Sequence, residues 1–283
     1  MTTAPPASFA LPGFWADLKT TDFTRLDRTR CIAVLPLAAI EQHGPHLPLR
    51  VDAALADGVI ASALAHLPAG QPVLFLPTQS IGFSPEHTRF AGTLTLKADT
   101  ILRLWTEIAE SVAASGVKKL VLLNAHGGQA GLLDVVARDL RARLGMLVYS
   151  VNSFNLPLLD EQGASVADRF SAHEHRFGIH AGEMETSMML ALKPALVDMA
   201  SAQNFHSTSQ DRAAQFSILG DGRSAKLGWQ MQDYNPHGAV GNAAAATADK
   251  GRALLAAMGR SLARLLAEID RLPADTLSDA TAP

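Results

Sequence analysis

The sequence has a single cysteine, no excess of charge of one sign and no long hydrophobic run. With Cys31 alone among 283 residues, the chain can form neither a disulfide framework nor a zinc site built from cysteines. Cys31 lies in the apolar run CIAVLPL, which is typical of a small buried hydrophobic residue rather than of a nucleophile. The net charge of −3 lacks the basic excess typical of nucleic-acid binding, so we expect no nucleic-acid partner.

No segment reaches the roughly 18 consecutive apolar residues of a membrane span, so we expect no membrane association. The N-terminus also lacks a basic region followed by an apolar stretch, which is the pattern of a secretory signal. The expected location is therefore the cytoplasm.

Apolar segments of two lengths alternate along the rest of the chain. Short runs that are apolar at nearly every position predict buried strands, and longer helical patterns follow them. This order predicts an α/β fold with a mostly parallel sheet covered on both faces. The predicted strands are Cys31–Leu37, Val73–Pro77, Lys119–Asn124 and Met146–Val151, and the predicted helices are Ala53–His66, Ala98–Ser115, Gln129–Leu144, Gly182–Leu192 and Asn242–Ile269.

Neither an internal repeat nor a linker divides the chain, so we expect one domain over residues 1–283. Its Pro- and Ala-rich start, residues 1–13, predicts a loose arm, and residues 270–283 predict a frayed tail. Two long polar stretches, residues 78–97 and 200–241, interrupt the pattern. Long ordered loops are usually functional, and in open α/β folds ligands bind where such loops gather, beyond the carboxyl ends of the strands.

The first candidate site follows the first predicted strand, in the segment LPLAAIEQHGPHLPLRVDAALA. Glu41 and His43 lie two residues apart, so they point to the same side of an extended chain. Asp52 comes directly before a helical pattern. Two acids and a histidine that converge there provide mixed oxygen and nitrogen ligands for a divalent metal. Each also has an ordinary alternative: Asp52 as a helix N-cap, and Glu41 and His43 as solvated loop residues.

Two further segments carry the same residue types. The string VLLNAHGGQAG places His126 at a strand-to-helix turn, where a Gly–Gly pair permits close approach of a ligand. The string GIHAGEMETSMMLALKP places His180 just before a predicted helix, with Glu183 and Glu185 in the first turn. The two glutamates can also simply complement the helix macrodipole, and His180 can be a loop residue.

The sequence resembles the creatininase (creatinine amidohydrolase) family in several strings that occur in the same order. These are EQHGPHLP-x3-D, EH-x2-F-x-GTL, N-x-HGG and HAGE-x-ETS, followed by GAVGNAAAATADKG, and together they span about residues 30–255. The resemblance implies a three-layer α/β/α sandwich and a hydrolase with two divalent metal ions per subunit. It also implies a homo-oligomer, commonly a homohexamer.

The resemblance implies a role for each candidate residue. Those matching Glu41 and His126 bind one metal, and the residue matching His43 binds the other. The residue matching Asp52 bridges the two metals, and the residue matching His180 is a catalytic acid or base beside them. Zinc and manganese both fit such a set of histidines and carboxylates, and iron is possible.

One position departs from the creatinine-hydrolysing members, which resemble N-x-H-x-E and use that glutamate as a ligand of the second metal. Here Gly128 occupies the position. We expect Glu183 to replace the missing ligand, because those members need no acid at its position. Glu185 matches the acid of the family's E-T-S string, so we expect it to brace His180 or a ligand. The alternatives are that water or Glu185 fills the gap and that Glu183 is a first-turn helix charge.

The implied reaction is hydrolysis by a metal-activated water, with His180 handing the proton to the leaving nitrogen. We expect the substrate to be a small cyclic amide or formamide, cleaved at a C–N bond other than a peptide bond. The departure at Gly128 argues against creatinine itself. The expected pocket walls come from residues 78–92, 153–177 and 216–237, which include Glu86, His87 and Trp229.

Three alternatives stay open. Two are hydrolases of the same family: one that cleaves a C–C bond in a cyclic keto-sugar or inosose, and a peptidase that matures a peptide-derived cofactor. The third is a metal-stabilised binding protein without turnover. The chain has no G-x-S-x-G, P-loop or G-x-G-x-x-G string, so the usual signals of serine hydrolases, kinases and dinucleotide enzymes are missing.

Overall fold

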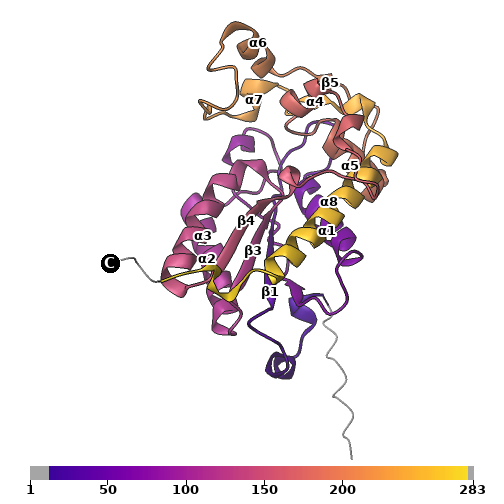
Figure 1. Cartoon of the computed structure of the whole chain (residues 1–283). Helices are drawn as coiled ribbons and strands as arrows, with labels where there is room; N and C mark the ends of the chain where they lie inside the picture. Colours follow the sequence, from indigo (N-terminus) through magenta and orange to yellow (C-terminus); the bar gives the residue numbers. More distant parts are fainter. Residues whose placement is uncertain (1–12, 280–283) are drawn as a thin grey trace, which may run out of the picture.

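Four parallel strands form the central sheet in the order β2-β1-β3-β4 (Figure 1). They are β1 (Ile32–Leu37), β2 (Val73–Phe75), β3 (Lys119–Asn124) and β4 (Leu147–Asn152), which match the four predicted strands with small shifts of their ends. The computed structural model describes residues 13–279 of the chain, so the predicted arm lies outside the described residues except for Gly13.

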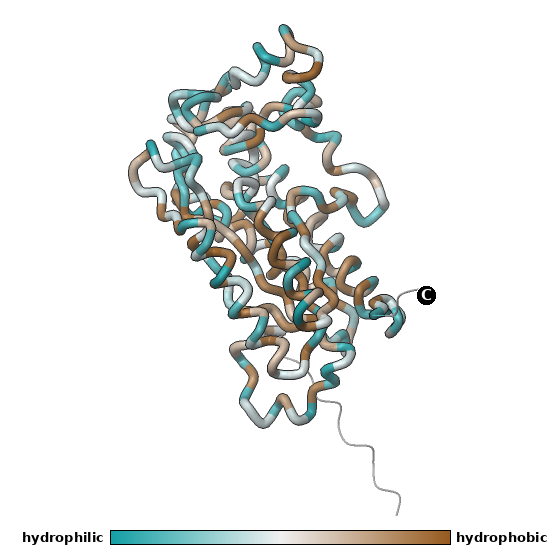
Figure 2. Tube along the Cα trace, turned by 90° about the vertical axis from the view of Figure 1, so that its left-hand side faces the viewer, coloured by the Kyte–Doolittle hydropathy of each residue, from teal (hydrophilic) through white to brown (hydrophobic). Residues whose placement is uncertain are grey.

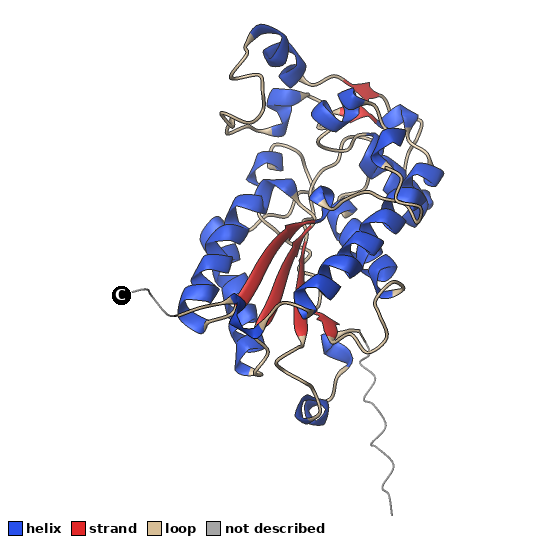
Figure 3. Ribbon diagram, viewed as in Figure 1, coloured by secondary structure: helices blue, strands red, loops and turns tan. Residues whose placement is uncertain are grey.

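Helices cover both faces of the sheet, and the predicted three-layer α/β/α sandwich is confirmed (Figure 3). One layer holds α1 (Val51–Leu64), α5 (Glu183–Leu192) and α8 (Ala248–Asp270), and the other holds α2 (Ala98–Ala114) and α3 (Ala130–Leu144).

Two hydrophobic cores result, one on each face. Successive side chains of a strand point to opposite faces, so Ile32 and Val34 pack under α1, whereas Ala33 and Leu35 pack under α2 and α3. In Figure 2 the hydrophobic segments run through these central elements. The expectation of a strand covered on both faces fails for β4, where Tyr149 and Ser150 are exposed because the strand is at the sheet edge.

Short elements stand beyond one end of the sheet, at the top of Figure 1. They are α4 (Ala172–Phe177), α6 (Thr208–Gln215), α7 (Met231–Tyr234) and the antiparallel pair β5 (Asn204–Phe205) and β6 (Gly241–Asn242). The helix predicted from residue 242 begins only at Ala248, because the preceding residues form β6 and a 3-10 turn. Thr247 caps α8 by accepting a hydrogen bond from the Lys250 backbone N–H at 3.3 Å.

Glycines lie at all three contacts among α1, α5 and α8. A β-carbon added to Gly58 of α1 would lie 2.7 Å from Leu192 Cδ1 of α5. One added to Gly251 of α8 would lie 2.8 Å from the backbone nitrogen of Met188 in α5, and one added to Gly259 of α8 would lie 2.5 Å from Ser62 Cβ in α1. These helices therefore pack more closely than side chains at those positions would permit.

The expected tail is partly fixed to the rest of the chain. Asp270 is the last residue of α8 and pairs with Arg30 at 2.6 Å, and Asp279 pairs with Arg141 at 2.9 Å. Residues 280–283 lie outside the described residues. Among the described helices, none combines the length and the apolar character needed to cross a membrane.

Candidate metal centre

The candidate residues gather beyond the carboxyl ends of β1 and β3. These two strands are neighbours, with Leu37 opposite Asn124, so the segments that follow them start side by side. The helix after β1 covers one face of the sheet and the helix after β3 covers the other, which opens a crevice at this point. Glu41 and His43 enter it from the segment after β1, and His126 enters it from the turn after β3.

Glu41, Asp52 and His126 form the first group of potential metal ligands, and all three are buried. The Nδ1 atom of His126 lies 3.2 Å from Glu41 Oε1 and 3.4 Å from Asp52 Oδ2. The other ring nitrogen, Nε2, donates to the backbone oxygen of Phe83 at 3.1 Å, so Nδ1 is the nitrogen that faces the two carboxylates.

His43, Asp52 and Glu185 form a second group that shares Asp52 with the first. The Nε2 atom of His43 lies 3.4 Å from Asp52 Oδ1 and 3.9 Å from Glu185 Oε2. Its Nδ1 donates to the backbone oxygen of Glu41 at 3.0 Å, so Nε2 is the ring nitrogen that faces the carboxylates. One oxygen of Asp52 therefore faces each group, which is the arrangement of a bridging carboxylate.

Asp52 is not the N-cap of α1. It is the second residue of the helix, and Arg50 stands at the cap without a side-chain capping bond. Because Asp52 is almost fully buried with its two oxygens toward histidines, helix capping does not account for its position.

The structure places Glu183 apart from the ligand groups. Its carboxylate pairs with the ammonium group of Lys250 on α8, and among the described residues no group of potential ligands includes it. Glu185, two residues further on α5, points to the centre instead. Its Oε2 accepts a hydrogen bond at 2.5 Å from the backbone N–H of Ala181, a residue with a φ of 55°.

His180 lies against the same centre. Its backbone forms a bridge with Val240, and its Nε2 donates to the backbone oxygen of Gln42 at 2.8 Å. The lone pair of Nδ1 is left 3.9 Å from Glu41 Oε1. The ring centroids of His180 and His43 are 4.2 Å apart, so the predicted acid or base lies next to both the Glu41 group and the His43 group.

Glu86 and His87 form a third group with Glu41. From the sequence they were expected only as pocket walls, since they lie in a long loop without periodicity. The Nε2 atom of His87 lies 3.4 Å from Glu41 Oε1, and Glu86 Oε1 lies 3.3 Å from Nε2 of His126. The signal that could have found them is the EH pair in the string that carries the family resemblance.

Burial controls protonation in this centre. It lowers the pKa of His180 well below its usual value and the pKa of His87 to about 4, so both rings are neutral at pH 7. Burial acts the same way on His43, but the Asp52 carboxylate outweighs it and raises the pKa of His43 to about 9. Burial raises the pKa of Glu185 to about 7 and raises that of Asp52. A cation at the centre would favour the charged forms of these carboxylates.

The donor atoms fit a bound cation. Four buried side-chain atoms that have no hydrogen-bond partner among the described residues converge here: Glu41 Oε2, His43 Nε2, Asp52 Oδ2 and Glu86 Oε1. Buried polar atoms without partners are costly, and a metal ion would satisfy them. Carboxylate and imidazole donors together suit zinc or manganese.

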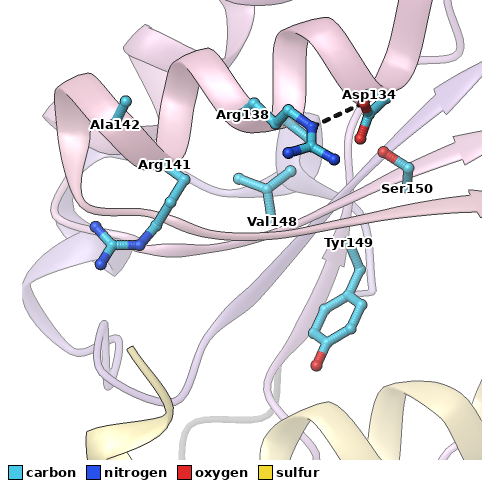
Figure 4. Close-up of a pocket in the computed structure, with 8 residues that line it drawn as sticks. Asp134, Arg138, Arg141, Ala142, Val148, Tyr149 and Ser150 are labelled. Carbon is cyan, nitrogen blue, oxygen red and sulfur yellow. Dashed lines mark hydrogen bonds and ion pairs between the residues drawn. The ribbon is translucent and has the colours of Figure 1, made fainter. Parts of the chain in front are cut away.

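A separate cavity of about 550 Å³ lies between α3 and the edge strand β4 (Figure 4). Arg138 and Asp134 form an ion pair at 2.8 Å on its wall. None of its lining residues belongs to the ligand groups. They are Asp134, Ala137, Arg138, Arg141, Ala142, Val148, Tyr149 and Ser150.

Comparison with known proteins agrees with this geometry. The family model for creatininase, described as creatinine amidohydrolase, matches residues 16–266. The chain belongs to the creatininase family. A mycofactocin precursor peptide peptidase from Mycobacterium tuberculosis is 31% identical over 248 residues, which cover 86% of this chain and 87% of the relative.

Two further relatives differ in coverage. The creatinine amidohydrolase of Pseudomonas putida is 28% identical over 179 residues, which cover 60% of this chain and 67% of that protein. A solved mutant creatininase of Zn–Zn type has a TM-score of 0.71 at 24% identity, with 92% of this chain and 98% of that chain covered. This last likeness shows a shared fold. The creatininase family members are hydrolases, and the ligand groups mark this chain as a metal-binding candidate of the same kind.

Proposed function

We propose that this chain is a metal-dependent hydrolase that cleaves amide C–N bonds at a centre for two divalent ions. Glu41, Asp52 and His126 would hold one ion, and His43, Asp52 and Glu185 would hold the other. The observation that carries the proposal is the position of Asp52, whose Oδ1 and Oδ2 each lie 3.4 Å from a different histidine.

Glu185 replaces Glu183 in this proposal as the ligand that compensates for Gly128. Together with His43 and Asp52 it gives the second ion three protein ligands, which leaves a position for water, as catalytic zinc sites do. When bound, the two ions would lower the pKa of a water molecule and polarise the substrate carbonyl.

His180 is the proposed acid and base. Its neutral Nδ1 faces the centre, so it can take the proton of the attacking water as the C–O bond forms. The same nitrogen then returns the proton to the leaving nitrogen as the C–N bond breaks. The nearby ring of His43 and the buried surroundings hold the imidazole in place.

We give a peptide amide precedence over the small cyclic amide or formamide expected from the sequence. The relative named as a precursor-peptide peptidase matches most of both chains, whereas the creatinine amidohydrolase matches a smaller part. Gly128 also lacks the side chain that the creatinine-hydrolysing pattern uses.

Substrate class and catalytic residue can be tested together. Protein reloaded with zinc or manganese would be incubated with short peptides, small lactams, formamides and keto-inositols, and the products identified by mass spectrometry. We expect amide cleavage that His180→Ala reduces by about 10²-fold or more with both ions retained. The exposed His66, which lies just after α1 and outside the expected pocket walls, provides the control variant, His66→Ala, with unchanged turnover. C–C cleavage alone, or no turnover with any metal, would refute the proposal.

The homohexamer and the cytoplasmic location stay predictions. Light scattering coupled to size-exclusion chromatography measures the first, and cell fractionation the second.

A further inference from the structure

His87 differs from the other histidines of the centre in the kind of partner that fixes its ring. His43, His126 and His180 each place one ring nitrogen at a backbone carbonyl oxygen, which can only accept a hydrogen bond. When these rings are neutral, the other nitrogen of each presents a lone pair. The Nδ1 atom of His87 lies instead 2.7 Å from the side-chain nitrogen of Gln42.

Backbone partners fix which end of the Gln42 amide is the nitrogen. Its Oε1 accepts from the backbone N–H of Gly44 at 3.0 Å, and its Nε2 donates to the backbone oxygen of Gly238 at 2.9 Å. Gln42 Nε2 donates its second hydrogen to His87. It cannot donate it to Nε2 of His180, 3.3 Å away, because that nitrogen carries a hydrogen itself and donates it to the backbone oxygen of Gln42. Nδ1 of His87 is thus an acceptor, and its Nε2 carries the hydrogen.

This Nε2–H faces the centre without a closed hydrogen bond. Its contacts there are Glu41 Oε1 at 3.4 Å and Glu86 Oε1 at 3.9 Å, both longer than the 2.7–3.2 Å of ordinary N–H···O bonds. A protonated nitrogen cannot bind a metal, so His87 is excluded as a ligand although it lies in a ligand group. The His87 ring lies between the rings of His180 and Trp229. Its centroid is 4.4 Å from that of His180, which is stacked on it, and 6.2 Å from that of Trp229, which is nearly perpendicular to it.

We propose that His87 donates its Nε2–H to the carbonyl oxygen of the scissile amide, and that Gln42 is the positioning residue that fixes this donor. The proposal rests on the proposed function, because that oxygen becomes negative only when water adds to the carbonyl carbon. The C=O π electrons then move to the oxygen, and His87 stabilises the charge without losing its proton. The two stacked rings therefore have different roles: His180 presents a lone pair, and His87 presents a hydrogen.

Two variants separate this role from a structural one. His87→Leu removes the donor, and we expect kcat to fall by about 10²- to 10³-fold, the usual loss for one oxyanion donor, with KM and metal content unchanged. His87→Gln places an amide N–H near the position of Nε2, so part of the lost kcat should return. An unchanged kcat in His87→Leu would overturn the proposal. Loss of bound metal in step with activity would also overturn it, because His87 would then only support Glu41.

The hydrogen can be located directly. Neutron diffraction from deuterium-exchanged crystals of the metal-loaded enzyme should show a deuteron on Nε2 of His87 and none on Nδ1, and the reverse would overturn the proposal. Gln42→Glu should move the deuteron to Nδ1, because an ionised carboxylate only accepts hydrogen bonds, and should lower kcat as His87→Leu does. A wild-type enzyme that cleaves no amide would refute the proposed function itself, whereas amide cleavage unaffected by His87→Leu would refute only the assignment of His87.

Discussion

The carboxylate of Glu86 occupies the space that a side chain on residue 128 would need. A β-carbon added to Gly128 would lie 2.7 Å from Glu86 Cδ and 2.7 Å from His126 Nε2. Glu86 in its present position and a glutamate at residue 128 therefore exclude each other. This contact is a steric reason why glycine, and not the glutamate of the N-x-H-x-E string, is found at residue 128 of this chain.

Gly128→Ala should accordingly disturb the centre, by displacing Glu86 or the ring of His126. We expect lower metal content and lower activity, measured by elemental analysis and by rates on the best substrate. In Gly128→Ala combined with Glu86→Ala the loss should be smaller than the sum of the single losses, because one of the two clashes is gone. Gly127→Ala is the matched control, since a β-carbon there meets nothing within 4 Å. Equal effects of the two glycine substitutions would contradict the steric explanation.

Asp52→Ala should remove both ions, because each oxygen of Asp52 faces a different ligand group. Elemental analysis of the purified variant would measure the loss. A helix-capping role would instead cost about 1 kcal/mol with the metals intact. Asp57→Ala, on the same helix, is the control, since Asp57 is exposed and accepts a hydrogen bond from Thr78 on the protein surface. Two ions per subunit in Asp52→Ala would rule out the bridge.

Glu185→Gln and Glu183→Gln should have different effects. Glu185→Gln removes a charged oxygen 3.9 Å from His43, so the variant should keep one ion and lose the other. Glu183→Gln should keep both ions and lower the melting temperature, because Lys250 loses its buried partner. Metal stoichiometry and thermal unfolding of the pair test this, and loss of an ion from Glu183→Gln would restore the expectation drawn from the sequence.

Removal of metal should lower thermal stability. The buried oxygens and nitrogens of Glu41, His43 and Asp52 that lack partners would again be unsatisfied after treatment with a chelator. A ligand present at 100 times its Kd stabilises the native state by about 2.7 kcal/mol per site. The melting temperature should therefore rise with the concentration of added zinc or manganese. A melting temperature independent of metal would mean that the centre binds none.

Cys31 should resist thiol reagents in the native protein. It is fully buried, and burial raises the pKa of its thiol to about 12, so almost no reactive thiolate forms at pH 8. Labelling with iodoacetamide, followed by mass spectrometry, should give no adduct until denaturant unfolds the sheet. Rapid labelling under native conditions would show that β1 opens locally.

The sequence predicts those parts of the centre that depend on local order along the chain. Glu41 and His126 follow predicted strands, and parallel strands bring their carboxyl ends together, so their meeting follows from the strand order. The choice between Glu183 and Glu185 does not follow in this way. Residues two apart on a helix point to nearly opposite sides, and only the packing of α5 decides which one faces the crevice.

The proposed role of His87 could not be predicted from sequence patterns. It lies in a loop segment without periodicity, and its hydrogen is fixed by Gln42, whose amide is in turn oriented by Gly44 and Gly238. Gly238 is distant from Gln42 along the chain, so this arrangement exists only in the folded molecule.

The glycines between the helices also affect the geometry of the candidate metal centre. Asp52 stands at the start of α1 and Glu185 at the start of α5, while α8 contacts both helices through Gly259 and Gly251. Side chains at such contacts change the distance between helix axes by roughly 1 Å, whereas metal–ligand distances vary by only about 0.2 Å. Helix α8 thus sets the spacing of α1 and α5, and with it the spacing of the candidate ligands Asp52 and Glu185 at their starts.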